Sequence, residues 1–227
     1  MNQKVNEAYK DLFLNKIARY IILMGGRDAG RSTAGSQYAT AHLVGPDYFR
    51  CAIMRYVLGD IRNSIFQDIY DRIEENELLE AVKIREHLLT FEYGKNKING
   101  IGFKRSSGEQ KSKLKSLSNY NKVIIEEADE VIEEDFIQLD DSLRTTKSNV
   151  QIILQLNPPD KNHWIIKRWF NLVKSEVEGF YNLQLKESVK HDTVFIHTSY
   201  LDNIANIVPS TARNYENLHD PVAKIRM

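Results

Sequence analysis

Short apolar runs alternate with longer amphipathic stretches along most of this chain. Five runs have the length and apolar composition of buried strands, namely residues 20–24, 51–57, 122–125, 150–156 and 194–198. Residues 32–43 have helical composition, and residues 60–79 also look helical, because isoleucines at positions 61, 65, 69 and 73 have the spacing typical of a helix packed on a core. This alternation predicts an α/β fold, in which helices sandwich a mainly parallel sheet.

Two segments in the middle of the chain interrupt this alternation. Residues 88–93 and 98–104 flank a Gly-Lys-Asn-Lys turn, a pattern that predicts a small hairpin insertion. Residues 106–120 are polar and carry three lysines, Lys115 among them, so we expect a loop or short helix at the surface. This stretch is either a solvated connection or a loop that faces DNA or phosphate, and the sequence favours neither.

The strand predicted at residues 20–24 leads directly into a glycine-rich loop. Gly25 is followed five residues later by Gly30, and then by Arg31 and Ser32. This is the phosphate-binding spacing G-x-x-x-x-G-K-[S/T], with arginine in place of lysine. Backbone N–H groups in such a loop point at phosphate oxygens, and the following helix directs its positive end at the same anion. A glycine-rich turn that binds nothing would look similar, and arginine for lysine is not a conservative change.

The loop predicts a nucleoside-triphosphate site, with ATP and Mg²⁺ as its ligands. Arg31 would neutralise the β- and γ-phosphates, and the Ser32 hydroxyl would ligate Mg²⁺. Upstream, Tyr9 and Phe13 lie in an amphipathic stretch, which favours core packing over stacking on the adenine base. The residues predicted to bind ATP are Gly25, Gly26, Arg27, Asp28, Ala29, Gly30, Arg31, Ser32, Thr33 and Asn157.

A pair of carboxylates follows the strand predicted at residues 122–125. Beside the phosphate loop, Glu126 would hold the Mg²⁺ shell and Glu127 would act as general base on the attacking water. Aspartate is usual at the metal position, so Glu126 departs from the common pattern by one methylene. Many strands end in a solvated acidic loop, but together with the phosphate loop the pair becomes much more specific.

Composition narrows the class of protein. The chain has 227 residues, enough for one domain with a sizeable core, and 42% of them are hydrophobic. Its 31 basic and 31 acidic residues cancel, which argues against a uniformly basic surface but not against a local basic patch. Cys51 is the single cysteine, so we predict no disulfide framework, and no apolar run approaches the ~20 residues of a membrane span.

Further short motifs accompany the phosphate loop and the acid pair. They are Met54-Arg55, Leu58-Gly59-Asp60-Ile61-Arg62-Asn63-Ser64, Lys113-Leu114-Lys115-Ser116, Glu126-Glu127-Ala128-Asp129-Glu130, Leu143-Arg144, Asn157-Pro158-Pro159 with His163-Trp164, and Thr198-Ser199-Tyr200-Leu201-Asp202-Asn203. In this order, and over nearly the whole chain, they resemble the ATPase domain of tailed-phage terminase large subunits of the PBSX-like kind. The Glu-Glu-Ala-Asp-Glu and Asn-Pro-Pro…His-Trp motifs discriminate best, because generic ATPases lack them.

The resemblance implies a fold, an activity and a set of partners. The fold is a P-loop NTPase of the ASCE type, with residues 1–227 as the ATPase domain. The nuclease domain that follows in this family is expected to be absent from this chain. The activity is ATP hydrolysis that drives double-stranded DNA into a procapsid, performed by a ring of subunits on the portal protein with a small terminase subunit as partner. Such a protein acts in the host cell cytoplasm, without a membrane.

The resemblance also suggests roles for single residues. Asn157, at the end of a predicted strand, would sense the γ-phosphate and pass its loss to the two stiff prolines that follow. Arg144 and Lys115 are candidates for a catalytic basic residue that reaches a neighbouring subunit's site in trans, and Arg27 for a cis role. Each of these basic residues, taken singly, also fits an ordinary surface charge.

Two other functions stay open at this point. A helicase core would share the phosphate loop and the acid pair, but it would lack the Asn-Pro-Pro…His-Trp motif. A module that binds nucleotide weakly, or not at all, would dock a portal or a small terminase subunit, and Arg31 and Glu126 are the departures that support it. Nucleotide titration with and without Mg²⁺ separates these functions.

Overall fold

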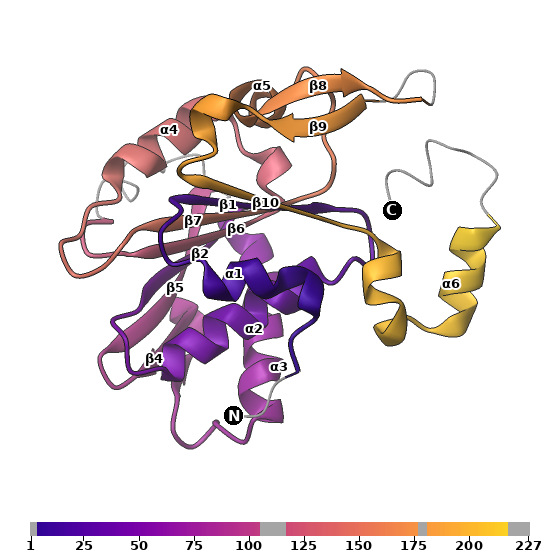
Figure 1. Ribbon diagram of the computed structural model, residues 1–227. Helices are drawn as coiled ribbons and strands as arrows, with labels where there is room; N and C mark the ends of the chain where they lie inside the picture. The colour runs from indigo at the N-terminus through magenta and orange to yellow at the C-terminus, as the bar shows by residue number, and fades with distance from the viewer. Residues whose placement is uncertain (1–3, 105–116, 177–180, 218–227) are drawn as a thin grey trace.

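The computed structural model describes residues 4–104, 117–176 and 181–217. Within these residues, a sheet of eight strands has the order β10-β1-β7-β6-β2-β5-β4-β3 (Figure 1). The six strands from β10 to β5 pair in parallel, whereas β4 and β3 add to one edge in antiparallel pairing. An antiparallel pair, β8–β9, lies outside this sheet.

The bounds of the elements follow the predicted alternation. The strands are β1 (Tyr20–Gly25), β2 (Arg50–Val57), β3 (Lys83–Arg85), β4 (Thr90–Tyr93), β5 (Asn96–Lys104), β6 (Lys122–Glu126), β7 (Gln151–Leu156), β8 (Phe170–Lys174), β9 (Tyr181–Leu185) and β10 (Thr193–Thr198). The helices are α1 (Lys10–Leu14), α2 (Arg31–Val44), α3 (Gln67–Glu75), α4 (Glu133–Ser142), α5 (Trp164–Trp169) and α6 (Pro209–Glu216). Short helical turns cover η1 (Glu7–Tyr9), η2 (Leu58–Ile61), η3 (Arg62–Phe66), η4 (Glu86–Leu88), η6 (Ala128–Glu130), η7 (Glu187–Val189) and η8 (Tyr200–Asn206).

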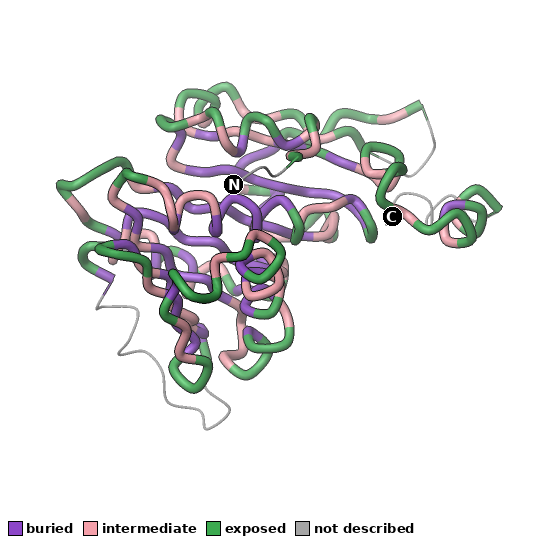
Figure 2. The backbone as a smooth tube through the Cα atoms, turned by 90° about the horizontal axis from the view of Figure 1, so that it is seen from below, coloured by how far each residue is buried: buried purple, intermediate pink, exposed green. Residues whose placement is uncertain are grey.

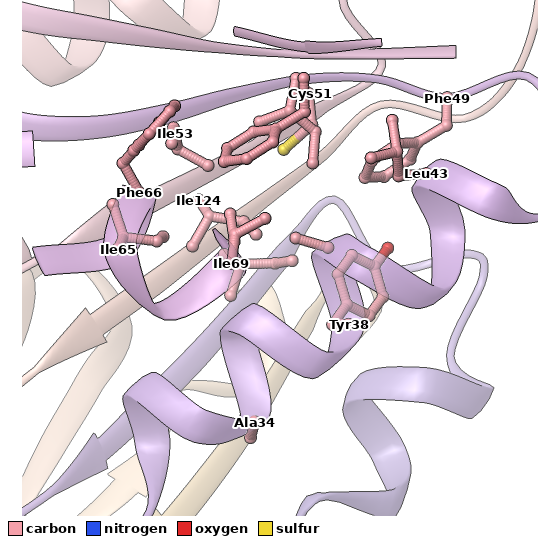
Figure 3. Packing of buried hydrophobic residues seen from close by; sticks show 14 of the residues in the cluster. Ala34, Tyr38, Leu43, Phe49, Cys51, Ile53, Ile65, Phe66, Ile69 and Ile124 are labelled. Carbon is pink, nitrogen blue, oxygen red and sulfur yellow. The ribbon is translucent and has the colours of Figure 1, made fainter. Parts of the chain in front are cut away.

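Helices cover both faces of the sheet, as predicted. In Figure 1, α1, α2 and α3 lie on one face, and α4, α5 and the β8–β9 pair lie on the other. Successive residues of a strand point to opposite faces, so Ile21 and Leu23 pack with the first layer and Ile22 and Met24 with the second. The central strands are buried along their length in Figure 2, and Figure 3 shows the side chains of α2, β2 and β6 meeting in the first layer. The α/β class and the mainly parallel sheet are therefore confirmed.

The order of the strands determines where the candidate site lies in the sheet. β7 lies between β1, which leads into the glycine-rich loop, and β6, which ends in the acid pair. Because β1, β6, β7, β2 and β10 are parallel neighbours, their carboxyl ends meet at one edge of the sheet, where ligands bind in open α/β folds. Within the described residues, no helix is long and apolar enough to cross a membrane.

Three local features add to or differ from the sequence-based expectation. The helix predicted at residues 60–79 is regular only in α3, because the backbone leaves the helical region at Ser64 (φ −127°, ψ −116°) inside a π-helical turn. The predicted hairpin is confirmed as β4–β5; the added finding is that β5 also pairs with β2, so that the hairpin extends the edge of the main sheet. The β8–β9 pair was not predicted. The predicted surface segment at residues 106–120 lies mostly outside the described residues.

His42 of α2 gives the stability of the fold a predicted pH dependence. Burial is the largest cause that lowers the pKa of His42 to about 4 from 6.5, and the nearby Lys122 charge adds to it. Because the folded state favours neutral imidazole, its contribution to stability is present above pH 6.5 and is lost as the pH falls toward 4. We expect His42→Gln to lessen the loss of unfolding free energy across this window by about 2 kcal/mol in urea titrations.

Asp68 provides the opposite control. Burial, and then the charge of Glu126, raise the pKa of Asp68 to about 6 from 3.8. Its contribution to stability is therefore present below pH 3.8 and is lost as the pH rises through 6. Asp68→Asn removes this contribution, so the variant should lose more unfolding free energy than the parent as the pH falls. If the unfolding free energy of His42→Gln had the same pH dependence as that of the parent, the pH effect assigned to His42 would be wrong.

Candidate nucleotide-binding site

The glycine-rich loop connects the carboxyl end of β1 to the amino end of α2. Gly25 closes against β10, since a Cβ atom there would lie 2.3 Å from the carbonyl oxygen of Thr198. Gly30 caps α2 in the left-handed conformation (φ 86°), which a glycine adopts without strain. The two glycines fix the turn, so that the amino end of α2, with its free N–H groups, begins at Arg31 beside the loop.

A polar cavity of about 450 Å³ lies over this loop. Loop residues that line it are Gly26, Asp28, Ala29, Gly30, Arg31, Ser32 and Thr33. Lys4 and Arg72 add positive charge from the amino-terminal segment and from α3, and Asn203 adds an amide from η8. The size and polarity of this cavity suit the phosphates of a nucleotide, and the positive amino end of α2 adds to its attraction for an anion.

Arg31 connects the loop to the end of β7. Its Nη2 atom donates to the Asn157 side-chain oxygen at 2.7 Å and to the carbonyl of Gly26 at 3.3 Å. Burial lowers the pKa of Arg31, and the negative charges of Asp129 and Glu126 oppose this shift. The guanidinium is therefore partly desolvated and bonded to neutral oxygens, and an incoming phosphate would compete for it.

Ser32 and Glu126 are brought together, as the metal prediction requires. The Ser32 hydroxyl donates to Glu126 Oε1 at 3.3 Å, and Glu126 Oε2 is buried without a hydrogen-bond partner. A hydroxyl and a carboxylate oxygen with spare acceptor capacity suit Mg²⁺, which prefers oxygen ligands. The described residues contain no group of three or more His, Cys, Asp or Glu side chains at metal-binding distance, so phosphate and water oxygens would supply the remaining ligands.

Glu127 follows β6 in the left-handed conformation (φ 50°) and forms an ion pair with Arg55 of β2. The largely buried Arg55 guanidinium also lies 3.9 Å from Glu126 and 3.8 Å from Glu130. The approach of Arg55 to Glu127 depends on the pairing of β2 with β6, so the sequence alone assigns Arg55 no role. In this arrangement the predicted base is neutralised by Arg55, and it would have to leave that pair before it accepts a proton.

Residues remote in sequence support the outer side of the loop. The Tyr9 hydroxyl donates to the Ala29 carbonyl at 2.6 Å, while its ring is buried in the core as predicted. Asn203 donates to the Asp28 carbonyl at 2.8 Å, and the Tyr215 hydroxyl of α6 bonds to the Asp28 carboxylate. The carboxyl-terminal segment therefore contacts the phosphate loop directly, through Asn203, which ends the last sequence motif, and through Tyr215, which no motif marked.

The remaining candidates lie away from the cavity. Arg144 is exposed between α4 and β7, where its carbonyl accepts from the Asn119 N–H at 3.0 Å. That position is at the amino end of the sheet, about 20 Å along β7 from the loop, so Arg144 does not reach the site of its own chain. Arg27 is exposed on the loop and does not line the cavity. Lys115 lies outside the described residues.

Solved structures of phage terminases share this fold. The large terminase of a thermophilic bacteriophage superposes with a TM-score of 0.71 at 12% identity, covering 97% of this chain and 52% of that one. The same protein was solved in complex with ADP, with a TM-score of 0.65 at 11% identity over 90% of this chain and 46% of that one. The large terminase ATPase domain of Thermus phage P74-26 gives a TM-score of 0.63 at 17% identity, covering 95% and 88% of the two chains. These likenesses show a shared fold.

Sequence comparison identifies the family. The PBSX phage terminase large subunit of Bacillus subtilis (strain 168) is 25% identical over 205 residues, which are 89% of this chain and 46% of that relative. The chain thus spans about half the length of this curated relative. A family model described as phage terminase large subunit matches residues 17–220, and the chain therefore belongs to the phage terminase large subunit family.

Proposed function

We propose that this chain, residues 1–227, is the ATP-hydrolysing motor domain of a DNA-packaging terminase. It would work in the host cell cytoplasm, as a ring on a portal protein with a small terminase subunit, to drive double-stranded DNA into a procapsid. The observation that best supports the proposal is the meeting of Arg31, Ser32, Glu126 and Glu127 at one edge of the sheet, beside a polar cavity.

Each side chain has a definite task in this proposal. Arg31 and the loop N–H groups bind the β- and γ-phosphates, while Ser32 and Glu126 hold Mg²⁺. When bound, Mg²⁺ would neutralise charge on the phosphate oxygens. Glu127, once released from Arg55, would orient the attacking water and accept its proton.

Asn157 provides a path from the nucleotide to the rest of the chain. A phosphate that takes the Arg31 guanidinium would weaken its 2.7 Å bond to Asn157. Asn157 precedes Pro158 and Pro159, whose fixed φ angles make the segment stiff, so a change at Asn157 would move this segment as a unit. Loss of the phosphate would restore the bond and reverse the movement.

The test is nucleotide titration followed by turnover. We expect ATP binding that depends on Mg²⁺ by calorimetry, and phosphate release that rises when double-stranded DNA and procapsids are added. Binding without hydrolysis in the complete motor would contradict the proposal and identify a docking module. Absence of nucleotide binding would contradict the site itself.

Arg31→Ala tests the phosphate contact. The change removes a charge-assisted hydrogen-bond donor, and we expect ATP binding to weaken by about 1.5 kcal/mol, roughly 10-fold in Kd. Arg31→Lys should keep or raise activity because it restores the common residue of such loops. The matched control is Arg27→Ala, on the same loop but outside the cavity lining. A large loss in Arg27→Ala with no loss in Arg31→Ala would place the phosphates on Arg27.

A further inference from the structure

A second cavity, of about 390 Å³, lies at the amino end of the sheet, the end remote from the phosphate loop. Its floor includes Lys122 and Gln151, the first residues of β6 and β7. Tyr38 and His42 of α2 form part of its wall. The cavity therefore shares the helix α2, but no lining residue, with the candidate nucleotide site.

Lys122 gives this cavity a buried positive charge. The residue is only 8% exposed, and its ammonium donates to Gln151 Oε1 at 2.8 Å and to the carbonyl of Asn149 at 3.1 Å. Both acceptors are neutral, and the ion pairs of the described residues do not include Lys122. Buried charges are usually paired, because desolvation without a counter-charge is costly. An anion in the cavity would supply the missing partner.

The rim reinforces the positive charge. Lys16 and Lys147 are exposed lining residues, whereas Asp47 is the single acidic residue of the lining. His42 is neutral near pH 7, because burial and the Lys122 charge lower its pKa to about 4. With Lys122 protonated, the lining carries three positive charges and one negative charge, a balance that attracts an anion.

Aromatic side chains form the walls. Phe13 and Tyr38 contact edge to face with ring centroids 5.7 Å apart, and His42 stacks on Phe49 at 5.5 Å. Tyr48 lines the opening with the Lys147 ammonium 4.9 Å from its ring centroid. The half-buried faces of Phe13 and Tyr48 offer apolar surface to a planar ring, and the cavity volume lies in the range of small-molecule sites.

We propose that this cavity binds a small aromatic anion, with its ring against Phe13 and Tyr48 and its phosphate or carboxylate on Lys122. The ring supplies apolar contact, and the anionic group forms a charge-assisted hydrogen bond to a desolvated ammonium. This inference does not depend on the proposed ATPase function, because the two sites share no lining residue.

The experiment uses calorimetric titration of the full chain with phenyl phosphate and with benzoate. Excess Mg²⁺ and pyrophosphate, which has no aromatic ring, keep the phosphate loop occupied during the titration. We expect at least one of the two probes to bind at least 10-fold tighter than inorganic phosphate, which lacks the ring. Whichever probe binds tighter identifies the anionic group that the cavity prefers.

Lys122→Met provides the decisive variant. It keeps an unbranched side chain, shorter by the charged nitrogen, and removes the charge, and we expect the Kd of the tighter probe to rise at least about 10-fold. Lys83→Met, an exposed lysine of β3, is the matched control and should leave the Kd unchanged. If Lys122→Met fails to fold, the double variant Lys16→Ala with Lys147→Ala replaces it, with an expected loss of about 3-fold or more.

Several results overturn the proposal. They are no measurable binding of either aromatic probe, equal affinity for inorganic phosphate, or an unchanged Kd when Lys122 or both rim lysines are replaced.

Discussion

Glu127→Gln should reduce ATP hydrolysis at least ~100-fold while ATP stays bound, the usual scale for loss of a general base. The amide keeps the size of the carboxylate but cannot accept the proton of the attacking water. Glu127 lies beyond the end of β6, next to Glu126, where the Ser32 hydroxyl approaches. Steady-state phosphate release and an ATP titration on the same preparation measure both parts of the prediction.

Glu130→Gln is the matched control for this change. Glu130 also lies beside Arg55, at 3.8 Å, so its replacement removes a similar charge from the same guanidinium without touching the predicted base. We expect turnover in Glu130→Gln to stay within a few-fold of the parent. If Glu127→Gln turned over at a near-normal rate, Glu126 or Asp129, which has a buried oxygen without a hydrogen-bond partner, would become the candidate base.

Much of the fold was predictable, because the apolar residues that mark strands and helices in the sequence are the residues that pack in the core. The apolar runs before Gly25 and Glu126 are β1 and β6, and they are buried throughout, as strands of a parallel sheet covered on both faces are. The isoleucine stripe that includes Ile65 and Ile69 packs in the core. Its regular helix is shorter than predicted, because periodicity reports which face is buried and cannot detect a π-helical turn at Ser64.

The candidate site was predictable only where its residues are consecutive. The phosphate loop and the acid pair can be read from the sequence, since glycine spacing and strand-ending carboxylates are local signals. Arg55 and Tyr215 give no such signal, because their contacts with Glu127 and Asp28 arise from strand order and from the return of the carboxyl-terminal segment. The β8–β9 pair was missed for a related reason: its strands are largely exposed and lack a buried apolar run.

The assembly of subunits into a ring should have the other large effect on the rate of ATP hydrolysis. We expect the isolated chain to be mostly monomeric and to hydrolyse ATP about 10³-fold more slowly than the assembled motor, the scale attributed to a missing trans arginine. Arg144 is exposed at the amino end of β7, remote from the phosphate loop of its own chain, so it could act only on a neighbouring subunit. Lys115 is the alternative candidate. Phosphate release by the isolated chain, and by the chain on portal-bearing procapsids, measures the difference.

Mixing two inactive variants tests the trans role directly. Glu127→Gln keeps Arg144 but lacks the predicted base, and Arg144→Ala keeps the base but lacks the predicted trans residue. A mixed ring contains interfaces at which an intact Glu127 meets an intact Arg144, so activity should return above that of either variant alone. Lys115→Ala replaces Arg144→Ala in a parallel mixture. If the monomer already turned over as fast as the motor, both trans assignments would be wrong, and Arg27, which lies on the loop itself, would be the candidate that completes the site within one chain.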